Sequence, residues 1–152
     1  MGRIAKIARR TFLIGSATIA GGVAFGIYEA KKPIPNPLLK DLGPGEAAIT
    51  PFVKIDANAI TLITPRADKG QGTYSLQAYL IAEELDVDPH TCKLDPGEPH
   101  QAYYNGVAAA DNAPFPGYDH GWVPEHVRSI LSGVGKIMSL QLTGGSTTTP
   151  DM

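Results

Sequence analysis

The stretch ADKGQGTYSLQAYLIAEELDV, residues 67–87, places a glycine–glutamine–glycine turn directly in front of an amphipathic segment. Apolar side chains recur in that segment at intervals of three and four residues, the spacing that puts them on one face of a helix. These side chains are Tyr74, Ala78, Ile81 and Leu85. The pattern predicts a helix over residues 74–85, with Thr73 as its N-cap and one buried face.

The turn itself, Gly70-Gln71-Gly72, has two interpretations that its spacing leaves open. Glycine lets a backbone approach a ligand with no Cβ in the way, and a helix start offers unpaired N–H donors to an anion. The turn could therefore hold a phosphate or another electron-rich ligand, or it could be a tight strand-to-helix connection that binds nothing. Glu83 and Glu84 lie off the apolar face and are predicted to face solvent, not to form an acid–base pair.

The segments on either side of this helix predict a small sheet. Two short β-branched runs around a polar turn predict a hairpin over residues 52–64. The HTCKL run at residues 90–94 is a candidate third strand. Upstream, residues 33–50 are rich in Pro and Gly and are predicted to be an extended linker.

The C-terminal part of the chain predicts one more helix between two other segments. Residues 103–122 hold turn residues and aromatics and are expected to be long and irregular, as functional loops and domain contacts often are. A proline start and apolar residues at helical spacing predict a helix over residues 124–136. Those apolar residues are Val127, Ile130, Leu131 and Val134. Residues 137–149 are expected to form a strand that runs into a Gly-Gly-Ser-Thr turn.

The distribution of charge argues against one class of partner. The formal net charge is −2, but residues 33–152 hold seven basic and 14 acidic side chains and would repel a phosphate backbone. Nucleic acid is therefore not an expected partner. No metal site is predicted, because the four histidines lack the paired spacing of metal ligands. They are His90, His100, His120 and His126. Cys92 is expected to be a small buried hydrophobic side chain.

The N-terminal segment resembles an export signal. Arg9 and Arg10 precede an uncharged run over residues 11–28 that is weakly hydrophobic, since it is rich in Gly, Ala and Ser. This order is similar to a twin-arginine signal, which exports folded proteins, often with a cofactor already inserted, and it implies a periplasmic location. An ordinary amphipathic helix is the alternative, but the run lacks a polar face. A clear cleavage site is missing, so the run is also a candidate membrane anchor.

Five motifs occur in the order found in one enzyme family: VKIDANAITLITPRADKGQG, IAEELDVD, AYYNG, PFPGYDHGW and LQLTGGSTTTPD. Together they resemble the N-terminal part of the molybdopterin-binding large (beta) subunit in the xanthine dehydrogenase/aldehyde oxidase family, of the isoquinoline 1-oxidoreductase or periplasmic aldehyde dehydrogenase type. The implied fold is α+β: a signal helix, then a partial α/β layer of hairpin, strand and two helices, incomplete as a fold. The expected domains are a signal or anchor (1–32), a linker (33–50) and a partial molybdopterin-binding domain (51–152).

The resemblance also implies a cofactor, partners and a reaction. In the family, the glycine–glutamine–glycine turn and the later Gly-Gly-Ser-Thr turn contact a molybdenum–molybdopterin cofactor, in its cytosine dinucleotide form. The matching residues here are Gly70, Gln71, Gly72, Gly144, Gly145, Ser146 and Thr147. The implied partners are the remainder of the large subunit and a small [2Fe–2S] subunit, with a cytochrome c subunit as a further candidate. The implied reaction hydroxylates an aldehyde or N-heterocycle at carbon, with oxygen from water.

The chain departs from the family in two places. Asp68-Lys69 stand where the family usually has Glu-Met, and Lys69 could pair with a phosphate or face solvent. Family members also continue far beyond TGGSTTTPDM, to the glutamate that acts as general base, so no catalytic residue is expected in this chain. The sequence resembles a truncated or split large subunit that is inactive alone. A non-catalytic, exported and membrane-tethered interaction module is the alternative function.

Overall fold

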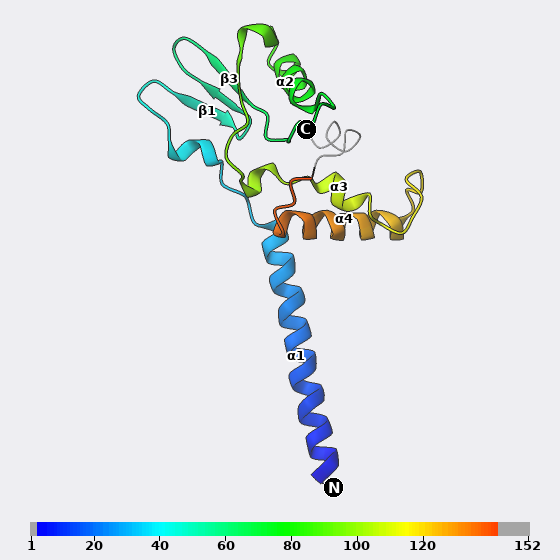
Figure 1. Ribbon diagram of the computed structural model, residues 1–152. Helices are drawn as coiled ribbons and strands as arrows, with labels where there is room; N and C mark the ends of the chain where they lie inside the picture. The colour runs from blue at the N-terminus through cyan, green and yellow to red at the C-terminus, as the bar shows by residue number, and fades with distance from the viewer. Residues whose placement is uncertain (1–2, 143–152) are drawn as a thin grey trace. The chain divides into compact units, whose positions relative to one another are not determined.

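The computed structural model describes residues 3–142, with the backbone alone for residues 3–6 and 8. The chain divides into two compact units, Met1–Pro33 and Ile34–Met152. The fold class is α+β, as expected, with an apolar N-terminal helix followed by a unit that combines helices with a small sheet (Figure 1).

Helix α1, Arg3–Lys31, makes up almost all of the described part of the first unit. Its stretch Arg9–Lys31, 23 residues that contain an 18-residue window with a mean hydropathy of 1.5, is long and apolar enough to cross a membrane. The hydroxyls of Ser16 and Thr18 donate to helix carbonyls one turn earlier, at 2.6 and 2.9 Å, so neither opposes burial in an apolar medium. A signal sequence meets the same criteria of length and composition, so the helix is compatible with a signal or an anchor.

The second unit contains a four-stranded mixed sheet in the order β1-β2-β3-β4. The strands are β1 (Ala47–Thr50), β2 (Val53–Ile55), β3 (Ile60–Ile63) and β4 (Lys93–Asp95). The first three run antiparallel to their neighbours, and β4 runs parallel to β3. Strands β2 and β3 confirm the predicted hairpin, and its turn is fixed by Asp56, whose Oδ1 accepts from the N–H groups of the next turn residues at 2.7 and 2.8 Å.

Two predictions about this region need correction. Residues 33–50 are not extended throughout, because they contain a 3₁₀ turn, Pro37–Lys40, and the strand β1. Strand β1 pairs with β2, and that partner lies outside the segment from which the linker was predicted. The third strand begins at Lys93 and not at residue 90, because Pro89–Thr91 form another 3₁₀ turn.

Helix α2, Thr73–Glu84, connects β3 to β4 and packs on the sheet. The shared core is formed by apolar side chains from both: Val53, Leu62, Ala78, Ile81 and Ala82. Glu83 and Glu84 are exposed, as predicted. Thr73 was wrongly expected to be the N-cap: it is the first helical residue, buried against the core, and Gly72 is the cap.

Helices α3, Gly106–Ala110, and α4, Trp122–Ile137, pack against each other beside the sheet. Helix α4 confirms the helix predicted over residues 124–136 and extends it at both ends. The expectation of a wholly irregular segment over residues 103–122 is wrong, since α3 lies inside it with Asn105 as its N-cap. The strand expected from residue 137 is also wrong for its described part: Ile137 ends α4, and residues 138–142 form no strand.

Tyr103 joins the sheet to the segment that leads into α3. Its side chain is 1% exposed, its hydroxyl donates to the carbonyl of Pro51 at 2.9 Å, and its ring lies 5.5 Å from that of Phe52. Burial, assisted by the negative charge of Asp95, raises the pKa of Tyr103 from 10.0 to about 12. The fold therefore binds the neutral phenol more strongly than the phenolate.

We expect this phenol to make the fold sensitive to alkali. The pKa of Tyr103 is higher in the folded chain than in the unfolded chain, so the neutral phenol contributes fully to the free energy of unfolding below about pH 10. This contribution, about 2–3 kcal/mol, is lost as the pH rises to about 12. An absorbance titration of the six tyrosines should show one late step that coincides with loss of tertiary structure, and Tyr103→Phe should remove that step. A titration without this late step, in a chain that stays folded, would contradict the assignment.

Candidate functional site

The glycine–glutamine–glycine turn lies at the carboxyl end of β3, immediately before α2. Strand β3, helix α2 and the parallel strand β4 together form a strand–helix–strand crossover. The carboxyl ends of the two parallel strands meet at the same edge of the sheet, where the N–H of Thr64 donates to the carbonyl of Asp95 at 2.8 Å. In open α/β sheets, ligands bind beyond the carboxyl ends of parallel strands, and β3 and β4 are the parallel pair of this mixed sheet. The turn is therefore in a position from which it can contact a ligand.

Both glycines of the turn have backbone conformations that other residues rarely adopt. The φ angle is +99° at Gly70 and +80° at Gly72, in the left-handed region that favours glycine. A Cβ built at either position meets no atom within 4 Å, so the space above the backbone is open on this side. Side-chain crowding within the turn thus does not explain the glycines, whereas the backbone conformation does.

Asp68 occupies the position at the start of α2 that an external anion would take in one of the two interpretations of the turn. Its Oδ1 accepts from the N–H of Gly70 at 2.7 Å and of Gly72 at 3.3 Å, and its Oδ2 accepts from the N–H of Tyr74 at 3.0 Å. These backbone hydrogen bonds, led by that from Tyr74, hold the pKa of the Asp68 carboxyl below its usual value. The carboxylate therefore caps the helix and complements its dipole. A phosphate approaching these donors would have to displace it.

The Gln71 side chain is folded back on the turn. Its Nε2 donates to the carbonyl of Ala67 at 3.0 Å, and its Oε1 accepts from the N–H of Lys69 at 2.6 Å. The residue is nevertheless exposed, so its amide can exchange these bonds for bonds to a ligand without exposing a buried group. An amide can donate and accept at once, which suits a ligand that carries both kinds of polar atom.

The other predicted site residues are placed as follows. Gly144, Gly145, Ser146 and Thr147 lie outside the described residues. Arg9 and Arg10 are exposed on α1. Among the residues that the structure describes, no group of three or more His, Cys, Asp or Glu side chains is arranged to hold a metal ion. Cys92 follows a 3₁₀ turn and not a strand, and it packs, partly buried, against the core beside α2.

Three polar side chains behind the turn are buried and were missed by the sequence analysis. They are Arg66, Gln77 and Asn105, each no more than 3% exposed. The Oε1 of Gln77 accepts from the N–H of Arg66 at 3.1 Å, so the segment between β3 and the turn is fixed to α2. Gln77 lies one turn along α2 from Thr73, on the buried face. The sequence did contain a signal for the burial of Gln77, because helical spacing places this polar residue on the same face as the apolar side chains of the helix.

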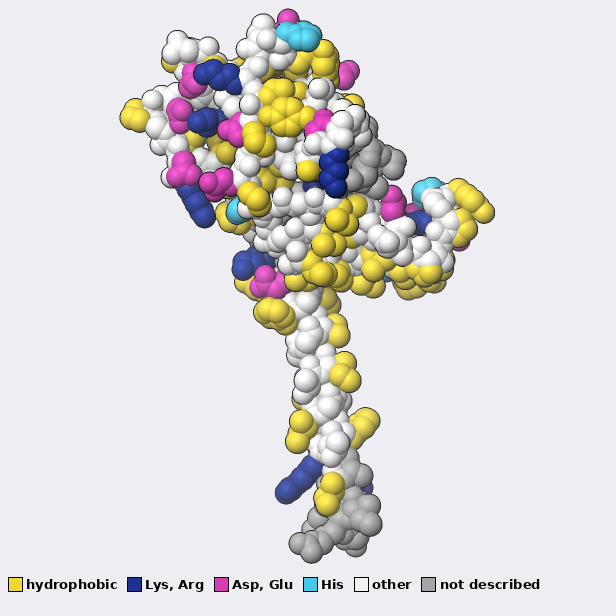
Figure 2. Space-filling view, in the orientation of Figure 1, with side chains coloured by type: hydrophobic (Ala, Val, Ile, Leu, Met, Phe, Trp, Pro, Cys, Tyr) yellow, Lys and Arg dark blue, Asp and Glu magenta, His cyan; other side chains and the backbone are white. Residues whose placement is uncertain are grey.

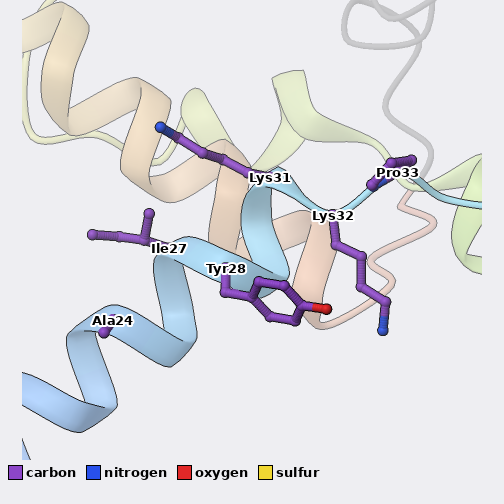
Figure 3. Close-up of a pocket in the computed structure, with 6 residues that line it drawn as sticks. All are labelled: Ala24, Ile27, Tyr28, Lys31, Lys32 and Pro33. Atoms are coloured by element: carbon purple, nitrogen blue, oxygen red, sulfur yellow. The ribbon is translucent and has the colours of Figure 1, made fainter.

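The last turns of α1 carry a shallow, open pocket. It is lined by residues of the first unit: Ala24, Ile27, Tyr28, Lys31, Lys32 and Pro33 (Figure 3). Along the helix, the aliphatic and aromatic side chains of the pocket are followed within one turn by its two lysines. An aromatic ring followed by lysines is typical of a helix end at a membrane–water interface, where lysine stems lie along apolar surface and their ammonium groups reach water. The residues at this end of α1 and the length of its apolar stretch are therefore both compatible with a helix that crosses a membrane.

A comparison with curated proteins links the chain to an oxidoreductase. It is 33% identical over 86 residues to a protein named isoquinoline 1-oxidoreductase subunit beta, from Brevundimonas diminuta. The match covers 55% of this chain and 10% of that protein. The link is a loose family one. The chain spans about a tenth of the length of this relative, which by its name is one subunit of a larger enzyme. No family model and no solved structure matches the chain.

Proposed function

We propose that this chain is the N-terminal, cofactor-contacting part of a molybdenum hydroxylase large subunit of the isoquinoline 1-oxidoreductase type. The observation that carries the proposal is its 33% identity over 86 residues to subunit beta of such an enzyme. The order of the five motifs, which is read from the same sequence, agrees with it. The proposal is limited to a contribution to the cofactor site, because the chain spans about a tenth of the length of this relative.

The turn residues fit a bulky cofactor by shape. Open space above Gly70 and Gly72 leaves their backbone accessible to a large planar group, and Gln71 presents an exposed amide beside them. When bound, the molybdenum cofactor would supply the oxidative chemistry, which hydroxylates carbon with oxygen from water. The chain's part is to hold the pterin edge through these three residues. Asp68 would keep the turn rigid by capping α2. Because its carboxylate already binds the N–H groups at the start of the helix, the cofactor would be held more by the amide of Gln71 than by the helix dipole.

Helix α1 supports a location at or beyond the inner membrane. Four basic residues lie at or before Arg10, and an apolar stretch of membrane-spanning length follows. More positive charge at the start than at the end of such a helix favours retention of the N-terminus in the cytoplasm and transfer of the second unit across the membrane. We propose the twin-arginine route to the periplasm, with the paired residues Arg9 and Arg10 as its signal.

The function is tested by molybdenum content. The full-length chain, tagged and recovered in detergent from a host that makes the cofactor, should carry molybdenum and pterin in the assembly in which it occurs. Gly72→Val should lower the molybdenum content about tenfold, because a branched side chain fills the open approach. Gln71→Ala should keep much of the metal but lose activity, since one or two polar contacts are worth about 1–3 kcal/mol. Absence of molybdenum from the wild-type assembly would refute the function and favour a non-catalytic module.

A matched variant separates backbone strain from loss of a ligand contact. Gly45 has a φ angle of +81° and, like Gly72, meets no atom within 4 Å of a Cβ built on it. Valine at either position should therefore cost a similar strain of about 1–3 kcal/mol. Only Gly72→Val should lose molybdenum. Equal loss of metal in Gly45→Val would assign the effect to general destabilisation and not to the turn.

A further inference from the structure

Helix α4 is apolar on two faces, and the described residues of the second unit, 34–142, cover only one of them. Pro124 and Gly135 are buried, on the side that faces α3. Four other apolar side chains recur at intervals of seven, four and three residues, which aligns them on a different face. These residues, the α4 seam, are Val123, Ile130, Val134 and Ile137, and they are 52%, 65%, 43% and 41% exposed. Figure 2 shows hydrophobic side chains gathered along this helix.

The seam has the pattern of a helix that packs against another element. With the half-buried Val127, its members alternate at intervals of four and three residues, the spacing that packs into the grooves of a neighbouring helix. The opposite side of α4 carries polar residues at the same kind of spacing: Glu125, Ser129, Ser132 and Lys136. A helix with a polar side and an exposed apolar side has a face left to bury.

Two possible occupants of the seam are disfavoured by composition. Helices that lie on a lipid surface carry many Lys and Arg residues on their polar side. Helix α4 has two basic residues, Lys136 and Arg128, and the guanidinium of Arg128 is bound by the carbonyls of residues 116 and 119. The net negative charge of residues 33–152 would also oppose binding to an anionic leaflet. A coiled coil with a second copy of the same helix is disfavoured because the repeat covers about two heptads, whereas a coiled-coil pattern is sustained over three or four.

The length of the curated relative points to a third occupant. Nine-tenths of isoquinoline 1-oxidoreductase subunit beta lies outside the match with this chain. A large protein buries a larger fraction of its surface than a unit as small as the second unit of this chain. The unmatched part of the relative therefore offers polypeptide that could cover faces exposed in this chain. Other large apolar side chains of the second unit are exposed as well, among them Leu39, Ile49, Trp122 and Met138.

We infer that the α4 seam is the surface on which the rest of a subunit-beta polypeptide docks. The occupant is an apolar face of the polypeptide that corresponds to the nine-tenths of the relative that this chain does not span. This inference rests on the proposed function, since both assign the chain to that type of enzyme. It goes further in naming the contact, which lies on α4 and not at the glycine turn.

Site-specific crosslinking tests the contact. A photo-crosslinking benzoylphenylalanine is placed at Ile130 in the full-length chain, and a matched one at Ser129, which is exposed next to it on a different face. After illumination in the native host, the crosslinked peptides are sequenced by mass spectrometry. Position 130 should give a peptide similar to the unmatched part of isoquinoline 1-oxidoreductase subunit beta, at least tenfold more than position 129. A crosslink to a second copy, to lipid or to an unrelated protein, or no crosslink, would overturn the inference.

A charge substitution gives a second and independent measurement. Ile130→Glu should lower recovery of that same polypeptide with the tagged chain at least tenfold, and Ser129→Glu should leave it unchanged. Both residues are exposed, so neither substitution should alter the helical content measured by circular dichroism. Molybdenum in the assembly with no docking at the seam would refute the contact alone. Docking at the seam in an assembly without molybdenum would refute the proposed cofactor and leave the contact standing.

Discussion

Valine in place of Gly135 is expected to push α3 and α4 apart and to lower the free energy of unfolding by about 3 kcal/mol. A Cβ at this position would lie 2.7 Å from the Cβ of Ala109, closer than real Cβ contacts, and both atoms are held by helix backbone. Relief therefore requires movement of a helix. Urea unfolding of the full-length chain in detergent, followed by the fluorescence of its single tryptophan, Trp122 at the start of α4, measures the loss.

A second change tests whether the close approach is the cause. Ala109→Gly removes the opposing methyl group, so the double variant should recover part of the stability that Gly135→Val loses, beyond additivity. Gly117→Val is the matched control, because a Cβ at Gly117 meets no atom within 4 Å and its effect should stay within about 0.5 kcal/mol. A Gly135→Val variant as stable as that control would show that the two helices are not held this closely.

Local patterns in the sequence predicted the elements that depend on local spacing. The hairpin over residues 52–64 follows from two β-branched runs and an Asp-containing turn, and α2 and α4 follow from apolar residues at helical spacing. Strand β1 was missed because its partner, β2, makes it a strand, and Ala47–Thr50 has no strong pattern of its own. Helix α3 was missed because five residues are too few to show a period.

The contact of the candidate site with a cofactor stays a prediction. The sequence singled out Gly70 and Gly72 as a tight turn or a place of close approach, and the structure adds that both have positive φ angles. The capping of α2 by Asp68 was not predicted, because Asp68 lies four residues before the N-cap Gly72, whereas capping side chains usually stand at the N-cap itself. Side chains whose partners are far along the chain, such as Arg66 and Tyr103, carry no local signal at all. Their interactions appear only once the chain is folded.

The second large effect is expected at Arg66, whose buried guanidinium joins β3 to the segment before α3. Its Nη1 donates to the carbonyl of Tyr103 at 2.6 Å and its Nη2 to the carbonyl of Tyr104 at 3.2 Å. Arg66→Met keeps most of the side-chain volume but leaves both carbonyls without these donors. Hydrogen bonds to a charged group are worth about 1.5–3 kcal/mol each, so the free energy of unfolding should fall by about 4 kcal/mol.

Hydrogen exchange shows where that loss acts. In Arg66→Met, amide exchange over residues 103–110 should accelerate before that of β2 and β3, because the missing donors held this segment to the sheet. Arg66→Lys keeps the charge and one donor and should fall between Arg66→Met and the wild type. Lys93→Met removes a cation from an exposed position on β4 and should change stability by no more than about 0.5 kcal/mol. If Arg66→Met matched Lys93→Met, the guanidinium would not be what holds α3 to the sheet.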